Sequence, residues 1–301
     1  MTTRRAFLAA ALSAPGASQH LRRVLIVTGD SDTRYHDWRI LVPHLKSLLD
    51  NTGRFQVAQT EQPASLTRAG LERYSALVVF YNGQRWGAAA ETAVEGFVGG
   101  GGGLVTLHGV TYGPLMGTIQ GSDGKFRLEP AAAWPAWPRM LGVQWAPESI
   151  GHARRHEFTV RVVDRAHPIT AGLDASFTMD DELYHRMSLL PEARVLATAF
   201  SNPALGGTGG DEPVMWTVAY GRGRSFHSPL GHDVKAMSAP GFVHMFTRAV
   251  EWAAAAAGAA ARKDVRSLRF KLTKQIPGAG NYRGSMRAAD GVRTANPDLR
   301  L

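Results

Sequence analysis

The chain of 301 residues contains no cysteine. This absence excludes disulfide bonds, zinc sites with thiolate ligands, a thiol nucleophile and a lipoprotein anchor. The sequence also lacks a G-x-S-x-G motif and an H-E-x-x-H motif, so it offers neither a serine elbow nor a compact zinc-protease signature. No internal stretch is apolar enough to span a membrane. Catalytic groups must therefore be sought among other residue types.

The central part of the sequence carries no net charge. The formal net charge is +9, but residues 262–301 hold ten Lys or Arg against three Asp or Glu, and Arg4 and Arg5 add two more positive charges. Residues 6–261 therefore carry equal numbers of basic and acidic side chains. No basic stripe with interleaved aromatic residues is present, and we expect no nucleic-acid partner.

The N-terminus has the layout of a bacterial export signal. Two arginines at positions 4 and 5 precede a short Ala-rich apolar run and then small residues, in MTTRRAFLAAALSAPGASQ. The pattern Thr-Arg-Arg-x-Phe-Leu is typical of the twin-arginine type, so we predict a signal over 1–20 and a periplasmic or secreted protein. After its removal we expect no integral membrane segment. An amphipathic N-terminal helix is the alternative interpretation.

Apolar runs alternate with helical patterns through the first half of the chain. Such alternation is typical of an α/β fold with a mostly parallel sheet covered by helices on both faces. The strands are predicted at 22–30, 55–61, 75–82 and 104–109, and the helices at 37–53, 66–74 and 87–98.

The alternation of apolar runs and helical patterns stops at residues 110–150. This stretch is rich in Gly, Pro and Trp, which predicts an irregular insertion. Four more strands are predicted at 156–164, 193–200, 213–220 and 223–230. The last two flank a Gly-Arg-Gly turn and indicate a C-terminal β-hairpin. A helix over 240–258 closes the predicted domain, 21–258, and a basic, irregular tail follows at 259–301.

Polar residues stand where the predicted parallel strands end. Ligands of open α/β sheets bind outside the carboxyl ends of the strands. The loop after the first strand holds His36 and Trp38, the third strand ends at Asn82, and the fourth ends at His108, shortly before Tyr112. We therefore expect these side chains to gather at one edge as catalytic or substrate-binding groups.

A second group of candidates follows the later strands. The stretch YGRGRSFHSPLGHDV holds His227 inside a strand, which indicates a structural role, and His232 with Asp233 beyond its end. A histidine beside a carboxylate can act as a general base. Glu182, in DDELY, could serve as an acid or base if it is buried, with Tyr184 as a hydrogen-bond donor.

A metal site is an alternative use of the same histidines. His36, His108 and His232 could together bind Zn²⁺ or another divalent ion with one open position. The tryptophans leave two interpretations open, because they could stack on a sugar ring or fasten the insertion to the body of the domain. Those in the predicted upper loops are Trp38, Trp86, Trp134, Trp137 and Trp145.

Three stretches together resemble the trehalose-utilisation (ThuA-like) family, from about Val24 to Ala254. They are GGGGGLVTLHGVTYG, the series HEFTV, HPIT and DELY, and PVMWTVAYGRGRSFHSPLGHD with the following helix. The resemblance implies a flavodoxin-like fold, similar to class I glutamine amidotransferases but without their catalytic cysteine. It also implies a role in the metabolism of trehalose or related sugars. By matching motif, the positions to suspect are His108, Glu182, Tyr184, His232 and Asp233, with His36 as a further equivalent.

Three functions remain open on these grounds. The first is an exported hydrolase or lyase that acts on a disaccharide or its keto form by His/Glu acid–base chemistry. The second is a non-catalytic sugar-binding or accessory domain. The third is a metal-dependent hydrolase. Under each of the three functions, we expect the protein to bind a small-molecule carbohydrate.

Overall fold

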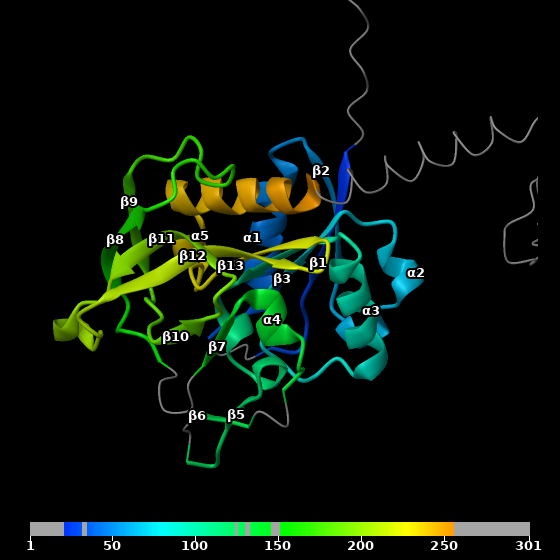
Figure 1. The fold of residues 1–301 in the computed structure, drawn as a ribbon, viewed down its shortest axis with the longest axis horizontal. Helices are drawn as coiled ribbons and strands as arrows, with labels where there is room; N and C mark the ends of the chain where they lie inside the picture. Colours follow the sequence, from blue (N-terminus) through cyan, green and yellow to red (C-terminus); the bar gives the residue numbers. More distant parts are fainter. Residues whose placement is uncertain (1–20, 32–34, 124–125, 130–132, 146–150, 256–301) are drawn as a thin grey trace, which may run out of the picture. The chain divides into compact units, whose positions relative to one another are not determined.

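A nine-stranded mixed sheet forms the centre of the domain (Figure 1). The computed structural model describes residues 21–31, 35–123, 126–129, 133–145 and 151–255. The strand order is β2-β1-β3-β4-β13-β12-β11-β8-β9. The predicted export signal (1–20) lies outside the described residues, as does the predicted tail (259–301). None of the described helices is both long and apolar enough to cross a membrane.

One half of the sheet is parallel, as the alternating pattern predicts. Here β1 pairs with β2 and β3, β3 pairs with β4, and β4 pairs with β13. The inner strands are nearly continuous runs of buried aliphatic residues, because helices cover both of their faces. The five strands are β1 (Arg22–Val27), β2 (Phe55–Thr60), β3 (Ala76–Val79), β4 (Gly103–Leu107) and β13 (Gly223–Ser228).

The other half is antiparallel and begins with the predicted hairpin between β12 (Asp211–Tyr220) and β13. Gly221, at φ +57°, provides the left-handed turn that joins the two strands. β11 (Arg194–Phe200), β8 (His156–Val162) and β9 (Ser176–Asp181) complete this half. The sequence patterns do not predict β9, which alternates exposed and buried residues at the sheet edge.

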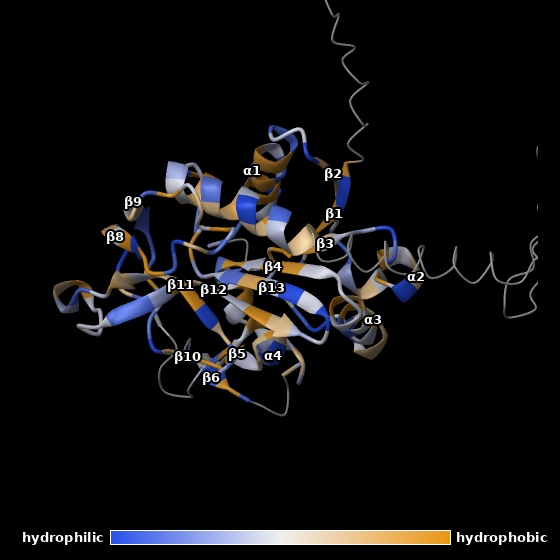
Figure 2. Cartoon of the chain, turned by 45° about the horizontal axis from the view of Figure 1, so that its top comes forward, coloured by the Kyte–Doolittle hydropathy of each residue, from blue (hydrophilic) through white to orange (hydrophobic). Residues whose placement is uncertain are grey.

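Helices divide between the two faces of the sheet. α1 (Trp38–Asp50) and the helix over 240–255 share one apolar core, and α3 (Ala88–Gly99) and α4 (Trp137–Leu141) share a second core on the opposite face (Figure 1). Two helices of four residues, α2 (Arg68–Leu71) and α5 (Val234–Met237), lie in loops. Apolar residues concentrate on the strands and on the sides of helices that face them (Figure 2).

The described part of the insertion contains more regular structure than its composition suggests. It contains the hairpin of β5 (Thr118–Gln120) and β6 (Phe126–Leu128), and β7 (Val143–Trp145) pairs with β10 (Met187–Leu189). Trp134, Trp137 and Trp145 are at most 3% exposed, and the first two rings stack at 5.1 Å. These tryptophans pack the insertion against the sheet and present no free face for a sugar.

Candidate functional site

His108 occupies a sharp bend at the carboxyl end of β4. Its backbone has φ +45°, in the left-handed region that residues other than glycine rarely adopt, and a short 3₁₀ helix (His108–Thr111) follows at once. Its side chain is fully buried, and Nδ1 donates to the carbonyl oxygen of Pro229 at 2.8 Å. Burial holds the pKa of His108 well below its usual value. The neutral ring therefore presents the lone pair of Nε2 to the site.

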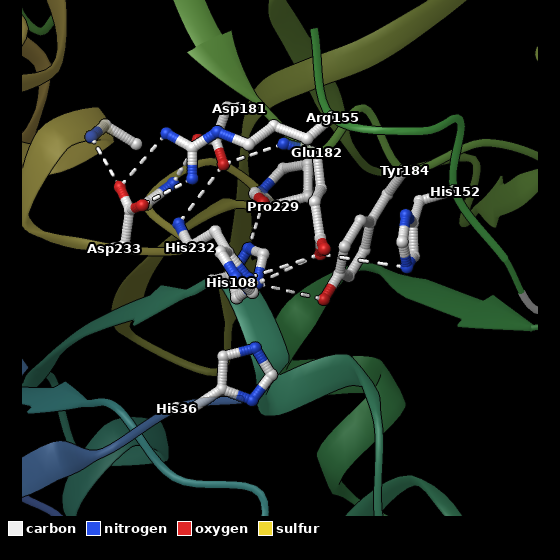
Figure 3. A network of polar contacts seen from close by, with 12 residues as sticks. His36, His108, His152, Arg155, Asp181, Glu182, Tyr184, Pro229, His232 and Asp233 are labelled. Atoms are coloured by element: carbon white, nitrogen blue, oxygen red, sulfur yellow. Dashed lines mark hydrogen bonds and ion pairs between the residues drawn. The ribbon is translucent and has the colours of Figure 1, made fainter. Parts of the chain in front are cut away.

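His232, in the loop after β13, lies next to the Nε2 atom of His108. Its Nδ1 lies 3.1 Å from Nε2 of His108 and 3.3 Å from Oε2 of Glu182 (Figure 3). The hydrogen bond with Glu182 raises the pKa of His232 against the opposing effect of burial. Although burial alone would raise the pKa of Glu182, the hydrogen bond with His232 and the nearby imidazoles bring it below its ordinary value. The contact between His232 and Glu182 thus favours the charged form of each side chain.

Glu182 contacts three of the histidines of the site. Its Oε2 lies 3.7 Å from Nε2 of His108 and 3.7 Å from Nε2 of His152, in addition to the contact with His232. The hydroxyl of Tyr184 lies 3.2 Å from Nε2 of His108, and the ring of His152 stacks on that of Tyr184 (Figure 3). Burial raises the pKa of Tyr184 well above its usual value, so the hydroxyl keeps its proton and donates.

His36 completes the cluster from the loop before α1. Its ring centroid is 4.8 Å from that of His108 and 5.2 Å from that of His232. The side-chain amide nitrogen of Asn82, beyond the end of β3, lies 3.3 Å from Nδ1 of His36 and orients the ring. One nitrogen from each of the three imidazoles lies within 4.8 Å of the other two.

Asp181 holds the backbone of the site in place. Its carboxylate is fully buried and accepts hydrogen bonds from the backbone N–H groups of Gly231, His232 and Glu182, at 2.6, 3.2 and 2.8 Å. Burial raises the pKa of Asp181 to about 6. One side chain from the end of β9 thereby fixes both Glu182 and the Gly-His-Asp loop.

Asp233 has a different environment from its neighbour His232. Its carboxylate caps α5 by accepting from the backbone N–H of Ala236 at 2.8 Å, and it forms an ion pair with Arg155 (Figure 3). Arg155 also contacts Asp180 at 3.0 Å. The pair predicted from sequence, His232 with Asp233, is therefore replaced by His232 with Glu182, because adjacent side chains of the loop point in different directions.

The remaining predicted residues lie at three different places. Tyr112 borders the site, with its ring 5.1 Å from that of Tyr184, and burial raises its pKa. Trp38, the first residue of α1, is 9% exposed and packs into the core, with Arg39 over its ring. His227 is buried inside β13, where its Nδ1 lies 2.8 Å from the hydroxyl oxygen of Thr106, away from the cluster.

A shallow hollow of about 300 Å³ opens beside His232. Its lining includes Tyr35, Ile40 and Lys235, and Tyr35 and Ile40 are 58% and 61% exposed. Exposed aromatic and aliphatic side chains next to a buried polar cluster are typical of a small-molecule site. This hollow gives His232 a route to solvent, whereas His108 lies deeper.

Three members of the site were missed by sequence reasoning, namely His152, Asp181 and Arg155. His152 and Arg155 belong to the loop before β8, and Asp181 directly precedes Glu182 in DDELY. Their approach to the cluster depends on the pairing of β8 with β9 and on the bridge between His152 and Tyr184. The only signal in the sequence was their proximity to motif residues.

Together, the fold and the site define a class of α/β proteins with a buried histidine at the bend after a central parallel strand. Comparison with known families identifies this one further, because the model of the ThuA family, described as trehalose utilisation, matches residues 23–253. The chain belongs to the ThuA family. No match is found among curated proteins.

Solved structures agree with this assignment. A ThuA-like protein from Parabacteroides merdae is 27% identical, with a TM-score of 0.64 over 78% of this chain and 90% of that one. A ThuA-like protein from Bacteroides uniformis is 18% identical, with a TM-score of 0.62 over 81% of this chain and 95% of that one. The fold class predicted from the sequence is thus confirmed.

Proposed function

We propose that this protein is a carbohydrate-active hydrolase or lyase in which Glu182 exchanges a proton with the substrate. The observation that carries the proposal is the contact of one carboxylate oxygen with nitrogens of three histidines, at 3.3, 3.7 and 3.7 Å. Such a carboxylate is ionised and can accept a proton from a substrate. The description of the family, trehalose utilisation, supports a disaccharide or its keto form as the substrate.

A keto sugar makes the chemistry accessible without a nucleophile. A carbonyl acidifies the C–H bond beside it, so that Glu182 can take this proton while the glycosidic C–O bond one carbon further on breaks. The electron pair of the C–H bond becomes the new C=C bond, and the departing oxygen needs a proton. His152 lies on the other side of Glu182, is 37% exposed in its side chain and can supply that proton when it is protonated.

The test measures turnover of a keto-disaccharide by the full chain. Glu182→Gln keeps the shape of the side chain but cannot accept the proton, so we expect a loss of at least about 10²-fold in kcat with the sugar still bound. Glu157→Gln, at an exposed position of β8, is the matched control and should retain wild-type turnover. Equal turnover by Glu182→Gln and wild type would refute the role of Glu182.

The alternative is a sugar-binding domain without turnover. It is favoured by the depth of His108, which is fully buried. Wild-type protein that binds the keto-disaccharide without consuming it would establish this alternative.

The proposal extends to location. The pattern Thr-Arg-Arg-x-Phe-Leu supports export through a twin-arginine route. A reporter fused to residues 1–20 should reach the periplasm, and replacing both arginines by lysine should keep it in the cytoplasm.

A further inference from the structure

We propose that His36, His108 and His232 bind one divalent transition-metal ion of the zinc class. One ring nitrogen from each lies within 4.8 Å of the other two. The three residues come from separate segments, the loop before α1, the end of β4 and the loop after β13, so no local pattern forces their rings together.

The distances between nitrogens suit ligation. Zn–N bonds of about 2.0–2.1 Å in a tetrahedral site place ligand nitrogens about 3.3–3.4 Å apart. His108 Nε2 and His232 Nδ1 are 3.1 Å apart, close to this value. The third ring, His36, has to approach by up to about 1.4 Å to bring a pair at 4.8 Å to that separation. It lies in a loop outside any helix or strand, where such a shift is least restricted.

The outer contacts also match those of metal-binding histidines. A ligating histidine usually donates its other ring N–H to a carbonyl or carboxylate, which fixes the tautomer. His108 does so through Nδ1 to Pro229, which leaves Nε2 as the ligand atom. The backbone of His232 is held by the buried carboxylate of Asp181.

The ligand type selects the ion. Imidazole nitrogens suit zinc, cobalt, nickel, copper and iron, whereas magnesium and calcium prefer oxygen ligands. Three protein ligands leave a fourth position for a substrate oxygen or water. Glu182 contacts two of the three proposed ligands, His108 and His232. There the ion would polarise a carbonyl or hydroxyl group while Glu182 moves the proton. This catalytic role rests on the proposed function, whereas binding of the ion does not.

The test uses Co²⁺ and Zn²⁺ as probes of the full chain after treatment with a chelator. We expect one equivalent of Co²⁺ to bind, with the visible absorption of a tetrahedral site, and Zn²⁺ to displace it. His36→Gln and His232→Gln should each weaken Co²⁺ binding by at least tenfold. His156→Gln is the matched control, because His156 is half-buried on β8 with Nδ1 directed at the carbonyl of Arg154.

Two results would overturn the proposal. One is wild-type protein that binds no Co²⁺ or Zn²⁺, and the other is binding that survives unchanged in both variants. Each is separable from failure of the proposed function, because sugar turnover is measured independently. Turnover by the metal-free protein would refute the catalytic role of the ion and keep the enzyme, whereas a bound ion without turnover would keep the metal site and refute the enzyme.

Discussion

The buried imidazole of His227 should make the protein sensitive to mild acid. Burial lowers its pKa to about 3, whereas a histidine in the unfolded chain titrates near 6.5. Between these values the unfolded chain binds a proton that the folded protein does not. The stability contributed by neutral His227 is therefore complete above about pH 6.5 and is lost as the pH falls below it.

The magnitude follows from the unfolded state alone. At about pH 5 an unfolded histidine is almost fully protonated, which favours unfolding by about 2 kcal/mol. A folded pKa anywhere below about 4 gives the same result, so the prediction does not depend on its value. For a domain of this size, about 2 kcal/mol corresponds to about 4–8 °C in Tm.

The assay compares unfolding at about pH 7.5 and pH 5 for wild type and His227→Leu. Leucine has no titrating group and fills a similar volume between Thr106 and Trp216. Other buried histidines act equally in both proteins, so the wild type should lose about 2 kcal/mol more than the variant between the two pH values. His156→Gln, as a control, should behave like wild type. An equal loss in wild type and His227→Leu would refute the reasoning.

Three further predictions concern the frame of the site. Asp181→Asn places an amide N–H₂ group against backbone donors, so denaturant unfolding should show a loss of about 1–3 kcal/mol and kcat should fall because His232 shifts. Gly113→Ala, at φ +100° with its Cβ 2.4 Å from a backbone oxygen, should cost more than about 2 kcal/mol. Gly53→Ala, at φ +64° with open space around it, should cost about 1–2 kcal/mol, and equal losses for the two glycines would contradict the argument. Arg155→Gln removes partly exposed ion pairs, so the loss should stay below about 1 kcal/mol, and a larger value in denaturant unfolding would show a structural role.

The parallel half of the fold was predictable because its signals are local. Continuous apolar runs such as 75–82 can be buried only in a covered sheet, and the helices between them carry clear apolar faces. The edge strand β9 was missed because its residues, SFTMDD, are too polar for such a run. The short strands β7 and β10 depend on each other across the chain, and no local pattern encodes that pairing.

The site residues also fall into those that the sequence could predict and those that depend on the folded structure. His36, His108 and Asn82 were expected at one edge because each follows a parallel strand, and the structure brings them together there. The partner of His232 could not be chosen from sequence, because Glu182 approaches only after β9 has joined the far edge of the sheet. The capping of α5 by Asp233 is likewise a matter of side-chain direction in the folded loop.

The site takes residues from both halves of the sheet, so a complete site indicates that the whole domain has folded. His36 and His108 come from the parallel half, whereas Glu182 and His152 come with the antiparallel strands. A fragment that ended before residue 150 would retain four parallel strands but neither Glu182 nor His152. If the proposed function holds, two fragments divided between the parallel and the antiparallel strands would gain turnover only on reassociation, which a complementation assay would measure.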